Sequence, residues 1–357
     1  MPTEDDYETR IADEEALATH LEPVLGEAST YAVERHEGGH SNETLFVTWG
    51  DRDLVVRRPP PGETAESAHD VLREYTVLSA LRDTDVRTPT VLHACEDESV
   101  IGSEFYVMER LAGDVIRDEE PDRFGTPAGR ERLGEELVDA LAEIHQVDYQ
   151  GVGLGDFGYP EGYLERQVDR WWKQYEWAFE VTEEVRSIPA VAEVGEWLEE
   201  NVPEAPTHTL VHGDYKLDNV MYGPGTPPEL VGVFDWEMST LGDPLADLGW
   251  MLHFWRDPDD PGPREGDSAP VFTEREGYPT RRELVDRYER QTGIEFENER
   301  FYRALTAFKM GGIGEMFFRR YLEGNSADPT YPLMEEQVPL RVQRAQEFIQ
   351  AGDDDIV

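Results

Sequence analysis

Three polar side chains in the middle of the chain have the types and spacing that phosphoryl transfer requires. Asp214 lies in the run 210–219, LVHGDYKLDN, and Asn219 follows it by five residues. Asp235 comes sixteen residues after Asn219, directly behind the apolar run 230–234. In such sites one carboxylate accepts the proton of the attacking hydroxyl, while an asparagine and a second aspartate hold Mg²⁺ on the nucleotide phosphates. The order and spacing predict Asp214 as the base and Asn219 and Asp235 as metal ligands.

The neighbours of Asp214 favour this interpretation over a simpler one, in which the aspartate only caps a helix at a turn. His212, Gly213 and Lys216 occupy the positions that a phosphoryl-transfer loop needs. Lys216 can reach the transferring group, and it is one of three lysines in a chain that otherwise uses arginine. That choice indicates a site that requires a compact ammonium. Asn219 offers a neutral oxygen, which suits a hard cation that keeps several waters.

A second cluster, near the N-terminus, predicts contacts to nucleotide phosphates. Gly38, Gly39, Ser41 and Asn42 lie between two runs of β-forming residues. Glycines let the backbone approach phosphate oxygens closely, and the two polar side chains add donors. A Gly-Gly pair between strands is more often just a turn, so this signal is weak by itself.

Arg57 is the cation expected beside these phosphates. Side chains alternate between the two faces of a strand, so Arg57 and Arg58 point in opposite directions, and we select Arg57. Glu74 lies on the edge of the apolar stripe of the next helical segment, where it can pair with Arg57. The expected pair would contact the α- and β-phosphates.

The elements that must position these residues fall into two groups. Short β-type runs are predicted at 31–34, 44–49, 54–57, 91–95 and 105–108, with one helix at 65–82. Helices are predicted at 133–144, 163–180, 191–201, 244–255, 281–292, 299–322 and 335–351. We therefore expect an α+β bilobal fold of the protein-kinase-like type. It would comprise an acidic N-terminal helix or extension (1–28), a small antiparallel-sheet N-lobe with one main helix (29–110) and a larger, mostly helical C-lobe (111–357).

Charge is the most extreme bulk property, with 78 Asp+Glu against 32 Lys+Arg and a formal net charge of −46. One interpretation is a field that steers a cationic substrate such as an aminoglycoside. The other is a halophilic surface that stays hydrated in molar salt. The acids run the whole length of the chain, and in molar salt a Debye length of about 3 Å would weaken steering, so the halophilic interpretation is favoured.

The remaining composition bounds the compartment and the partners. Strong acidity argues against nucleic acid and anionic membranes as partners. The single cysteine, Cys95, excludes an internal disulfide and fits a reducing compartment. The sequence shows neither a signal-peptide pattern nor an apolar run long enough to cross a bilayer. We expect a cytoplasmic protein, and its oligomeric state is open.

Several other residues have both a structural and a functional interpretation. Asp243 and Asp247 are expected to accept backbone N–H groups and to brace the catalytic loop. Glu237 could be a second metal or substrate contact, and this stays open. His145, a lone histidine at a helix end, is more often a satisfied core residue. The G-x-G-x-x-G match at 153–158 follows a helix rather than a strand, so it predicts a loop.

The acceptor site leaves less trace in the sequence. It would be formed by 163–180, 257–280 and 301–320, which carry no motif. The three tryptophans of the first segment, at 171, 172 and 177, are more often core than a substrate wall. Lys309 could meet an anionic group such as a CoA phosphate, although cations on a helix usually reflect solvation alone.

Taken together, these motifs resemble the aminoglycoside phosphotransferase / choline kinase-like family, a branch of the protein-kinase-like fold. The resemblance runs from residue 38 to about residue 322. It is nearest to the subgroup that is fused to acyl-CoA dehydrogenases in animals and free-standing in many microbes. Its landmarks lie at 56–58, 73–75, 105–109, 212–215 and 235–249.

The resemblance implies roles for the same residues. Asp214 would be the base, Asn219 and Asp235 the Mg²⁺ ligands. Arg57 and Glu74 would form the ion pair, and the backbone around Glu109 would meet the adenine. Arg57 stands where lysine is usual and Trp236 where phenylalanine is usual, and both departures fit the subgroup.

The implied activity is ATP- and Mg²⁺-dependent phosphorylation of the hydroxyl of a small molecule, a hydroxy acid or a hydroxyacyl-CoA thioester. Two alternatives stay open. One is an aminoglycoside-type antibiotic kinase, and the other is a pseudokinase that binds without turnover. The intact set of Asp214, Asn219 and Asp235 argues against the pseudokinase.

Overall fold

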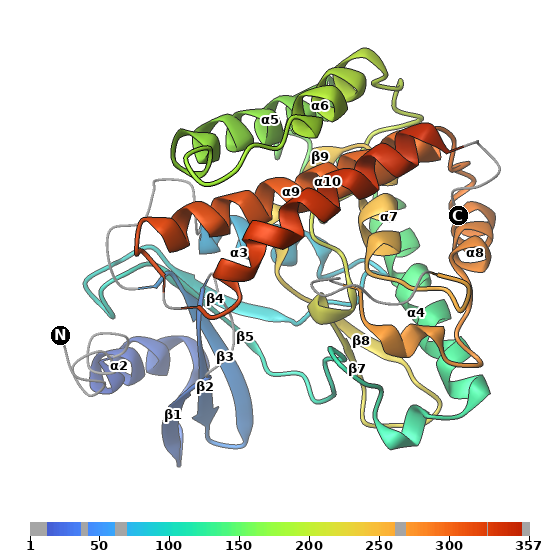
Figure 1. Cartoon of the computed structure of the whole chain (residues 1–357). Coiled ribbons are helices and arrows are strands. Elements are labelled where there is room, and N and C mark those ends of the chain that lie inside the picture. The colour runs from blue at the N-terminus through green and yellow to red at the C-terminus, as the bar shows by residue number, and fades with distance from the viewer. Residues whose placement is uncertain (1–12, 37–41, 61–69, 261–268, 327, 352–357) are drawn as a thin grey trace.

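The computed structural model describes residues 13–36, 42–60, 70–260, 269–326 and 328–351. A small lobe built on one sheet lies beside a larger lobe of helices (Figure 1). The expected bilobal α+β fold of the protein-kinase-like type is confirmed. Among the helices that are described, none combines the length and apolar character needed to cross a bilayer.

The small lobe is a five-stranded antiparallel sheet in the order β1-β2-β3-β5-β4. Its strands confirm the five predicted positions: β1 Tyr31–Arg35, β2 Glu43–Trp49, β3 Arg52–Arg58, β4 Val91–Cys95 and β5 Phe105–Glu109. Helix α2 (Glu14–Leu25) packs on one face and α3 (Val71–Leu81) on the other. The alternation within β3 shows this, because Val55 joins the α3 side while Leu54 and Val56 join the α2 side.

The same alternation separates the two arginines that end β3. Arg58 is buried and donates to the carbonyl oxygens of Pro59 (3.0 Å) and Ile101 (2.7 Å). Arg57 turns to the opposite face, toward α3. The sequence-based choice between these neighbours is therefore confirmed. Asp70 caps α3 by accepting from the Arg73 amide at 2.8 Å, so the described part of the helix predicted for 65–82 begins at Val71.

The large lobe contains seven long helices within the described residues, close to the predicted positions. They are α4 Pro127–His145, α5 Tyr163–Thr182, α6 Ala190–Glu200, α7 Pro244–His253, α8 Arg281–Thr292, α9 Glu299–Leu322 and α10 Met334–Gln350. Short 3-10 turns are η1 Asp122–Phe124, η2 Leu217–Asn219, η3 Trp236–Met238, η4 Val271–Glu274 and η5 Tyr331–Leu333. Helix α9 is central, since α5, α6, α7 and α10 all pack against it (Figure 1).

Outside the five-stranded sheet, the described residues form two small antiparallel pairs of strands. Strand β6 (Thr209–Val211) pairs with β9 (Thr240–Gly242), and β7 (Val220–Tyr222) pairs with β8 (Leu230–Val233). The turns that leave these strands carry the residues singled out from the sequence. The segment 153–158 is a loop of turns after α4, as predicted.

A buried ion pair connects the segment between α5 and α6 to the rest of the large lobe. Glu315 on α9 is fully buried, and Arg186 contacts both of its oxygens, at 3.0 and 2.7 Å. Arg186 also donates to the backbone carbonyl of Glu335 at 2.8 Å, which extends the link to α10. The pair therefore joins three segments that are distant in sequence.

Replacing Arg186 by alanine is expected to lower the free energy of unfolding by about 3–5 kcal/mol, because the Glu315 carboxylate would stay buried without its partner. Thermal unfolding in molar KCl measures the loss. Lys173→Ala is the control, since Lys173 forms an exposed pair with Asp169 at 2.6 Å on α5. Exposed pairs contribute about 0–1 kcal/mol. Equal losses in both variants would contradict this role for Arg186.

Candidate active site

The loop after β6 is held in place by a buried carboxylate from α7. Asp247 accepts the backbone N–H groups of His212 (2.5 Å) and Gly213 (2.8 Å). Burial alone would raise the pKa of Asp247, but the hydrogen bond and charge of His145 and the proximity of His212 outweigh it and lower that pKa. Asp247 is therefore an ionised brace, and the structural role predicted for it is confirmed.

Two more features fix the same loop. His212 Nε2 lies 2.8 Å from the Phe234 carbonyl oxygen, so this nitrogen donates to the segment before Asp235. Gly213 has a left-handed φ of 84°, and a Cβ there would lie 2.6 Å from the Met238 carbonyl oxygen. Any side chain at position 213 would therefore push apart the two segments that carry Asp214 and Asp235.

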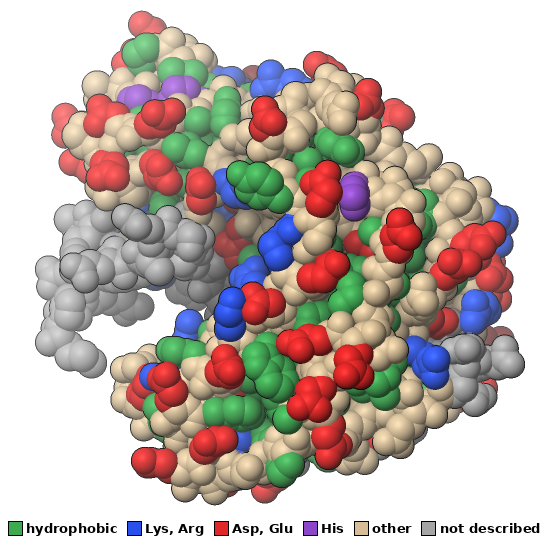
Figure 2. All heavy atoms as spheres, turned by 90° about the horizontal axis from the view of Figure 1, so that it is seen from above, with side chains coloured by type: hydrophobic (Ala, Val, Ile, Leu, Met, Phe, Trp, Pro, Cys, Tyr) green, Lys and Arg blue, Asp and Glu red, His purple; other side chains and the backbone are tan. Residues whose placement is uncertain are grey.

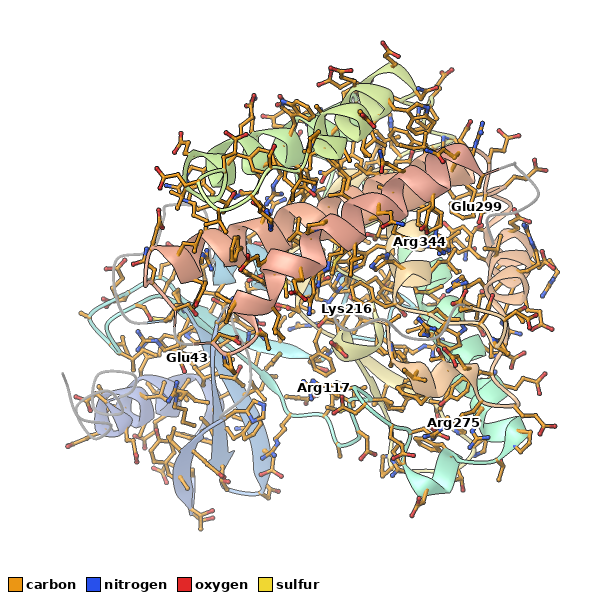
Figure 3. The ribbon with its side chains drawn as sticks, in the orientation of Figure 1. Glu43, Arg117, Lys216, Arg275, Glu299 and Arg344 are labelled. Atoms are coloured by element: carbon orange, nitrogen blue, oxygen red, sulfur yellow. The ribbon has the colours of Figure 1, made fainter. Side chains whose placement is uncertain are left out.

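Three donors orient the carboxylate of Asp214. Lys216 Nζ lies 3.1 Å from both of its oxygens, Asn219 Nδ2 donates to Oδ2 at 2.9 Å, and Trp250 Nε1 donates to Oδ1 at 2.8 Å. The side chain of Asp214 is still 23% exposed, so a substrate can reach it. Lys216 lies in the middle of the molecule, between the small-lobe sheet and the helices of the large lobe (Figure 3).

Asn219 and Asp235 are brought together by the β7–β8 pair. The Phe234 amide donates to the Asn219 carbonyl oxygen at 2.8 Å, so Asp235 follows directly beside the asparagine. Asn219 Nδ2 is used by Asp214, through both the backbone oxygen (2.8 Å) and the carboxylate. The remaining side-chain atom, Oδ1, is the one that can meet a cation. Asp235 has φ 66°, which is uncommon for a residue with a side chain.

An ion-pair network joins this segment to the small lobe. Arg57 Nη2 lies 3.5 Å from Glu74 Oε2 and 3.4 Å from Asp235 Oδ1. Glu74 in turn accepts the backbone N–H of Trp236 at 3.3 Å. Burial would lower the pKa of Arg57, but Glu74, Tyr106 and the nearby carboxylates raise it, so the guanidinium stays charged. The predicted Arg57–Glu74 pair is confirmed.

Some polar atoms of this network are left without protein partners. Within the described residues, Arg57 Nε and Asn42 Oδ1 are buried and make no hydrogen bond. Buried polar atoms are rarely left in this state unless a ligand or water completes them. Asn42 Nδ2 donates to Glu237 Oε2 at 3.4 Å, so Glu237 links the large lobe to the edge of β2. The other three predicted phosphate contacts, Gly38, Gly39 and Ser41, lie outside the described residues.

Glu109 ends β5 at the exit from the small lobe. Its amide donates to the Thr90 carbonyl at 2.9 Å, and the next amide, of Arg110, donates to the Asp53 carbonyl at 3.0 Å. Both donors are therefore used inside the sheet. An adenine that docks here would therefore have to hydrogen-bond to a backbone carbonyl or to residues beyond Arg110.

The described residues contain no group of three or more His, Cys, Asp or Glu side chains placed to hold a metal by themselves. This does not disfavour Mg²⁺, which is usually held by one or two carboxylates together with substrate phosphates and waters. Asn219 Oδ1 and the Asp235 carboxylate, whose side chain is 28% exposed, fit such an incomplete donor set.

Two residues beside Asp214 were not assigned to the site from the sequence. Trp250 on α7 carried no motif, and Lys309 on α9 was given two open interpretations, a contact to an anionic group or solvation alone. Lys309 Nζ donates to the Gly213 carbonyl at 2.9 Å and lies 3.6 Å from the centre of a Trp250 ring. The scarcity of lysine was a signal for Lys309, but it is not sufficient, because Lys173 is equally rare and lies exposed in a surface pair.

The residues expected to be structural gave mixed outcomes. His145 is buried against the Tyr288 hydroxyl at 2.6 Å, which confirms a satisfied core histidine. Asp243 caps α7 through the Leu245 amide at 2.9 Å, as a structural aspartate should. Trp171 is buried in the core, whereas Trp177 is 39% exposed beneath Arg319, so the core interpretation is wrong for Trp177.

Comparison with known proteins shows the family of the chain. The model of the phosphotransferase enzyme family (APH) matches residues 32–284. Acyl-CoA dehydrogenase family member 10 of Mus musculus is 36% identical over 330 residues, 90% of this chain and 30% of that protein. Family member 11 of Homo sapiens is 36% identical over 309 residues, 84% of this chain and 37% of that protein. The chain thus spans about a third of the length of these relatives.

Solved structures show the same fold. A crystal structure from Ralstonia eutropha, described as a candidate aminoglycoside phosphotransferase, is 33% identical with a TM-score of 0.81, covering 94% of this chain and 98% of that one. Choline kinase from Cryptosporidium parvum is 12% identical with a TM-score of 0.64, covering 97% and 98%. At that identity the second likeness shows the fold alone.

The fold and these matches define the class: the protein has the protein-kinase-like architecture of the small-molecule phosphotransferases. More closely, the chain belongs to the phosphotransferase enzyme family (APH), and it is similar to about a third of the length of the acyl-CoA dehydrogenase family members. The family resemblance inferred from the sequence is confirmed.

Proposed function

We propose that this kinase transfers the γ-phosphoryl group of ATP, with Mg²⁺, to the hydroxyl of a small hydroxy acid or hydroxyacyl-CoA. One observation carries the catalytic part: the partly exposed carboxylate of Asp214 is oriented by Lys216, Asn219 and Trp250. Such a carboxylate can align an incoming hydroxyl and take its proton. Nothing in the fold alone would require this set of donors around one aspartate.

In the proposed reaction, the acceptor oxygen attacks the γ-phosphorus of ATP. The bond from that phosphorus to the β,γ-bridging oxygen breaks, ADP leaves, and the hydroxyl proton passes to Asp214. Lys216, in contact with Asp214, offsets negative charge on the transferring group. Positioning and electrostatic stabilisation account for most of the catalysis in such transfers.

The nucleotide would lie between the proposed N-lobe (29–110) and the proposed C-lobe (111–357). Bound Mg²⁺ supplies positive charge to the phosphates, and Asn219 and Asp235 are the residues that would hold it. Arg57, kept charged by Glu74, would contact the phosphates, and its buried Nε without a hydrogen-bond partner supports this. Asn42, together with Gly38, Gly39 and Ser41, would contact the phosphates, and the backbone around Glu109 would meet the adenine.

Related structures support the nucleotide part of the proposal. Two solved structures of the same fold hold a nucleotide: one is a GDP and kanamycin complex, at 14% identity and a TM-score of 0.62, and the other is an ADP and spectinomycin complex, at 12% identity and a TM-score of 0.57. The relatives that are 36% identical to this chain are acyl-CoA dehydrogenase family members, which supports an acceptor with an acyl group. The aminoglycoside description of the Ralstonia eutropha structure favours the antibiotic alternative.

The proposal is tested by ADP release from Mg-ATP in molar KCl with separate additions of hydroxybutyrate, hydroxybutyryl-CoA, kanamycin and choline. We expect one of the two acyl compounds to stimulate ADP release, with a phosphorylated product of matching mass. Stimulation by kanamycin alone would establish the antibiotic alternative. ATP binding by thermal shift without stimulation by any compound would support the pseudokinase.

A further inference from the structure

Lys309 places a positive charge beside Asp214 from a different direction than Lys216. It comes from the middle of α9, donates to the Gly213 carbonyl at 2.9 Å and contacts the face of Trp250 at 3.6 Å. The indole of Trp250 in turn donates to Asp214 at 2.8 Å. One side chain therefore contacts both the expected base and this ammonium.

Lys309 differs from the other two lysines in its surroundings. Lys173 pairs with Asp169 and Lys216 pairs with Asp214, whereas the ammonium of Lys309 forms no ion pair with any described carboxylate. This is unusual in a chain of net charge −46. An ammonium has three N–H donors, and the Gly213 carbonyl accepts one of them. A half-buried cation with unused donors is costly unless a ligand completes it.

The pKa of Lys309 agrees with this picture. Burial lowers it to about 8, opposed in part by the negative charges of Asp214 and Asp247 and assisted by Arg170 and Lys216. The group is thus mostly charged near neutral pH but poorly solvated. An anion that entered beside it would recover the solvation that folding removed.

The ammonium also lines a small cavity next to the base. The cavity has a volume of about 30 Å³ and is lined by Trp171 and Trp250, by Gln167 and Thr306, whose side chains can donate hydrogen bonds, and on the side of α7 by Asp247. From above, acidic side chains are spread over the visible face of the molecule; several basic ones lie along the hollow at its middle, and others lie nearer its edges (Figure 2).

We propose that Lys309 binds an anionic group of the acceptor, a carboxylate or a phosphate, and so selects acidic hydroxylated molecules. This rests on the proposed kinase function and names its substrate class. Because Asp214 and Lys309 contact the same indole, the hydroxyl and the anionic group must lie near each other on the acceptor. A short free hydroxy acid meets that condition better than its CoA thioester, in which a neutral carbonyl replaces the nearby charge.

The same arrangement rejects cationic acceptors. An aromatic face near a kinase base can bind an ammonium by cation–π attraction. Here the face of Trp250 is already occupied by the protein's own ammonium. An aminoglycoside or choline would have to displace Lys309 or approach it against like charge, so specificity has a repulsive as well as an attractive part.

The test compares Lys309→Met with wild type, with Lys309→Arg retaining the charge and Lys173→Met as control. ADP release is measured with hydroxybutyrate, the butanediol of equal length, glycerol phosphate and hydroxybutyryl-CoA. We expect wild type to prefer one anionic acceptor to the diol. Lys309→Met should raise KM for that acceptor roughly 10- to 100-fold, the loss of one charged hydrogen bond. KM for ATP and the diol kinetics should change little, and Lys309→Arg should recover part of the loss.

Binding of the same compounds, measured by calorimetry with ADP present, separates the two proposals. Lys309-dependent binding of an anion without turnover would leave this inference standing and sink the kinase proposal for that acceptor. Turnover of the diol or of kanamycin as good as that of the acids would overturn the inference while keeping the kinase. An equal fall in kcat for every acceptor, with KM and binding unchanged, would also overturn it and make Lys309 a positioning residue of the Gly213 loop. A thermal midpoint close to wild type shows that each variant is folded.

Discussion

Asp214→Asn is expected to lower kcat for phosphoryl transfer by about 10²- to 10⁴-fold, the usual contribution of a general base. The amide has the shape of the carboxylate and can keep a contact to Trp250, so the loop should hold its geometry. It cannot take the proton of the acceptor, and it removes the charge that pairs with Lys216. ATP binding should be nearly unchanged, because in the proposed site the phosphates are held by Arg57 and by the Mg²⁺ that Asn219 and Asp235 would bind. Single-turnover rates and a nucleotide titration measure the two effects.

Asp218→Asn provides the matched control for this variant. Asp218 lies four residues further along the same loop and its side chain is exposed. The same acid-to-amide change there should alter kcat by no more than about twofold, as for surface substitutions in general. If Asp218→Asn lowered kcat as much as Asp214→Asn, the loss would reflect any acid-to-amide change in this loop rather than the loss of the general base. Normal turnover by Asp214→Asn would remove Asp214 from the mechanism.

The central part of the candidate site was predictable because its geometry is local. Asp214 and Asn219 share one loop, where five residues suffice to bring the amide nitrogen within 2.9 Å of the carboxylate. Asp235 returns to the same place through one two-stranded pair, β7–β8. Asp247 lies in the first turn of α7, shortly after strand β9. Few elements therefore separate it from the His212 amide, which donates a hydrogen bond to it. Spacing and residue type carry most of this information.

Trp250 and Lys309 were not predictable in that way, because their places depend on how helices pack. Trp250 is 36 residues from Asp214 and Lys309 is 96 residues from Gly213. The contact between them exists because α7 packs against α9. Such a contact has no fixed spacing in sequence, and both residues also have ordinary structural explanations.

Trp177 shows a case where the sequence held more information than the interpretation used. In α5 the buried positions include Trp171, Tyr175 and Ala178, which follow helical spacing. Trp177 falls off that stripe and is 39% exposed, with Arg319 stacked on its ring at 3.9 Å. Periodicity would have separated it from Trp171, whereas residue type alone grouped them. The fold class was easier to predict, because alternating apolar residues of strands and apolar stripes of helices recur along the whole chain.

Asp235→Asn is expected to lower kcat/KM for Mg-ATP by about 10²- to 10³-fold, comparable to removing one group that stabilises developing charge. The proposed metal site has two side-chain ligands, and the substitution removes the only charged one. It also weakens the contact of Arg57 at 3.4 Å, so part of the loss should remain at saturating Mg²⁺. Affinity for ATP with and without Mg²⁺ separates these parts: in wild type Mg²⁺ should tighten binding, and in the variant that gain should disappear.

Glu237→Gln is the comparison that decides which carboxylate serves the metal. It makes the same acid-to-amide change two residues further along, in the turn η3, where Glu237 accepts from Asn42 across the lobes at 3.4 Å. If Glu237 only links the lobes, its amide variant should keep the Mg²⁺-dependent gain in ATP affinity. A gain that persists in Asp235→Asn and vanishes in Glu237→Gln would move the proposed ligand to Glu237. Loss of the gain in both would mean that the two carboxylates share the cation, because each then contributes charge that the other cannot replace.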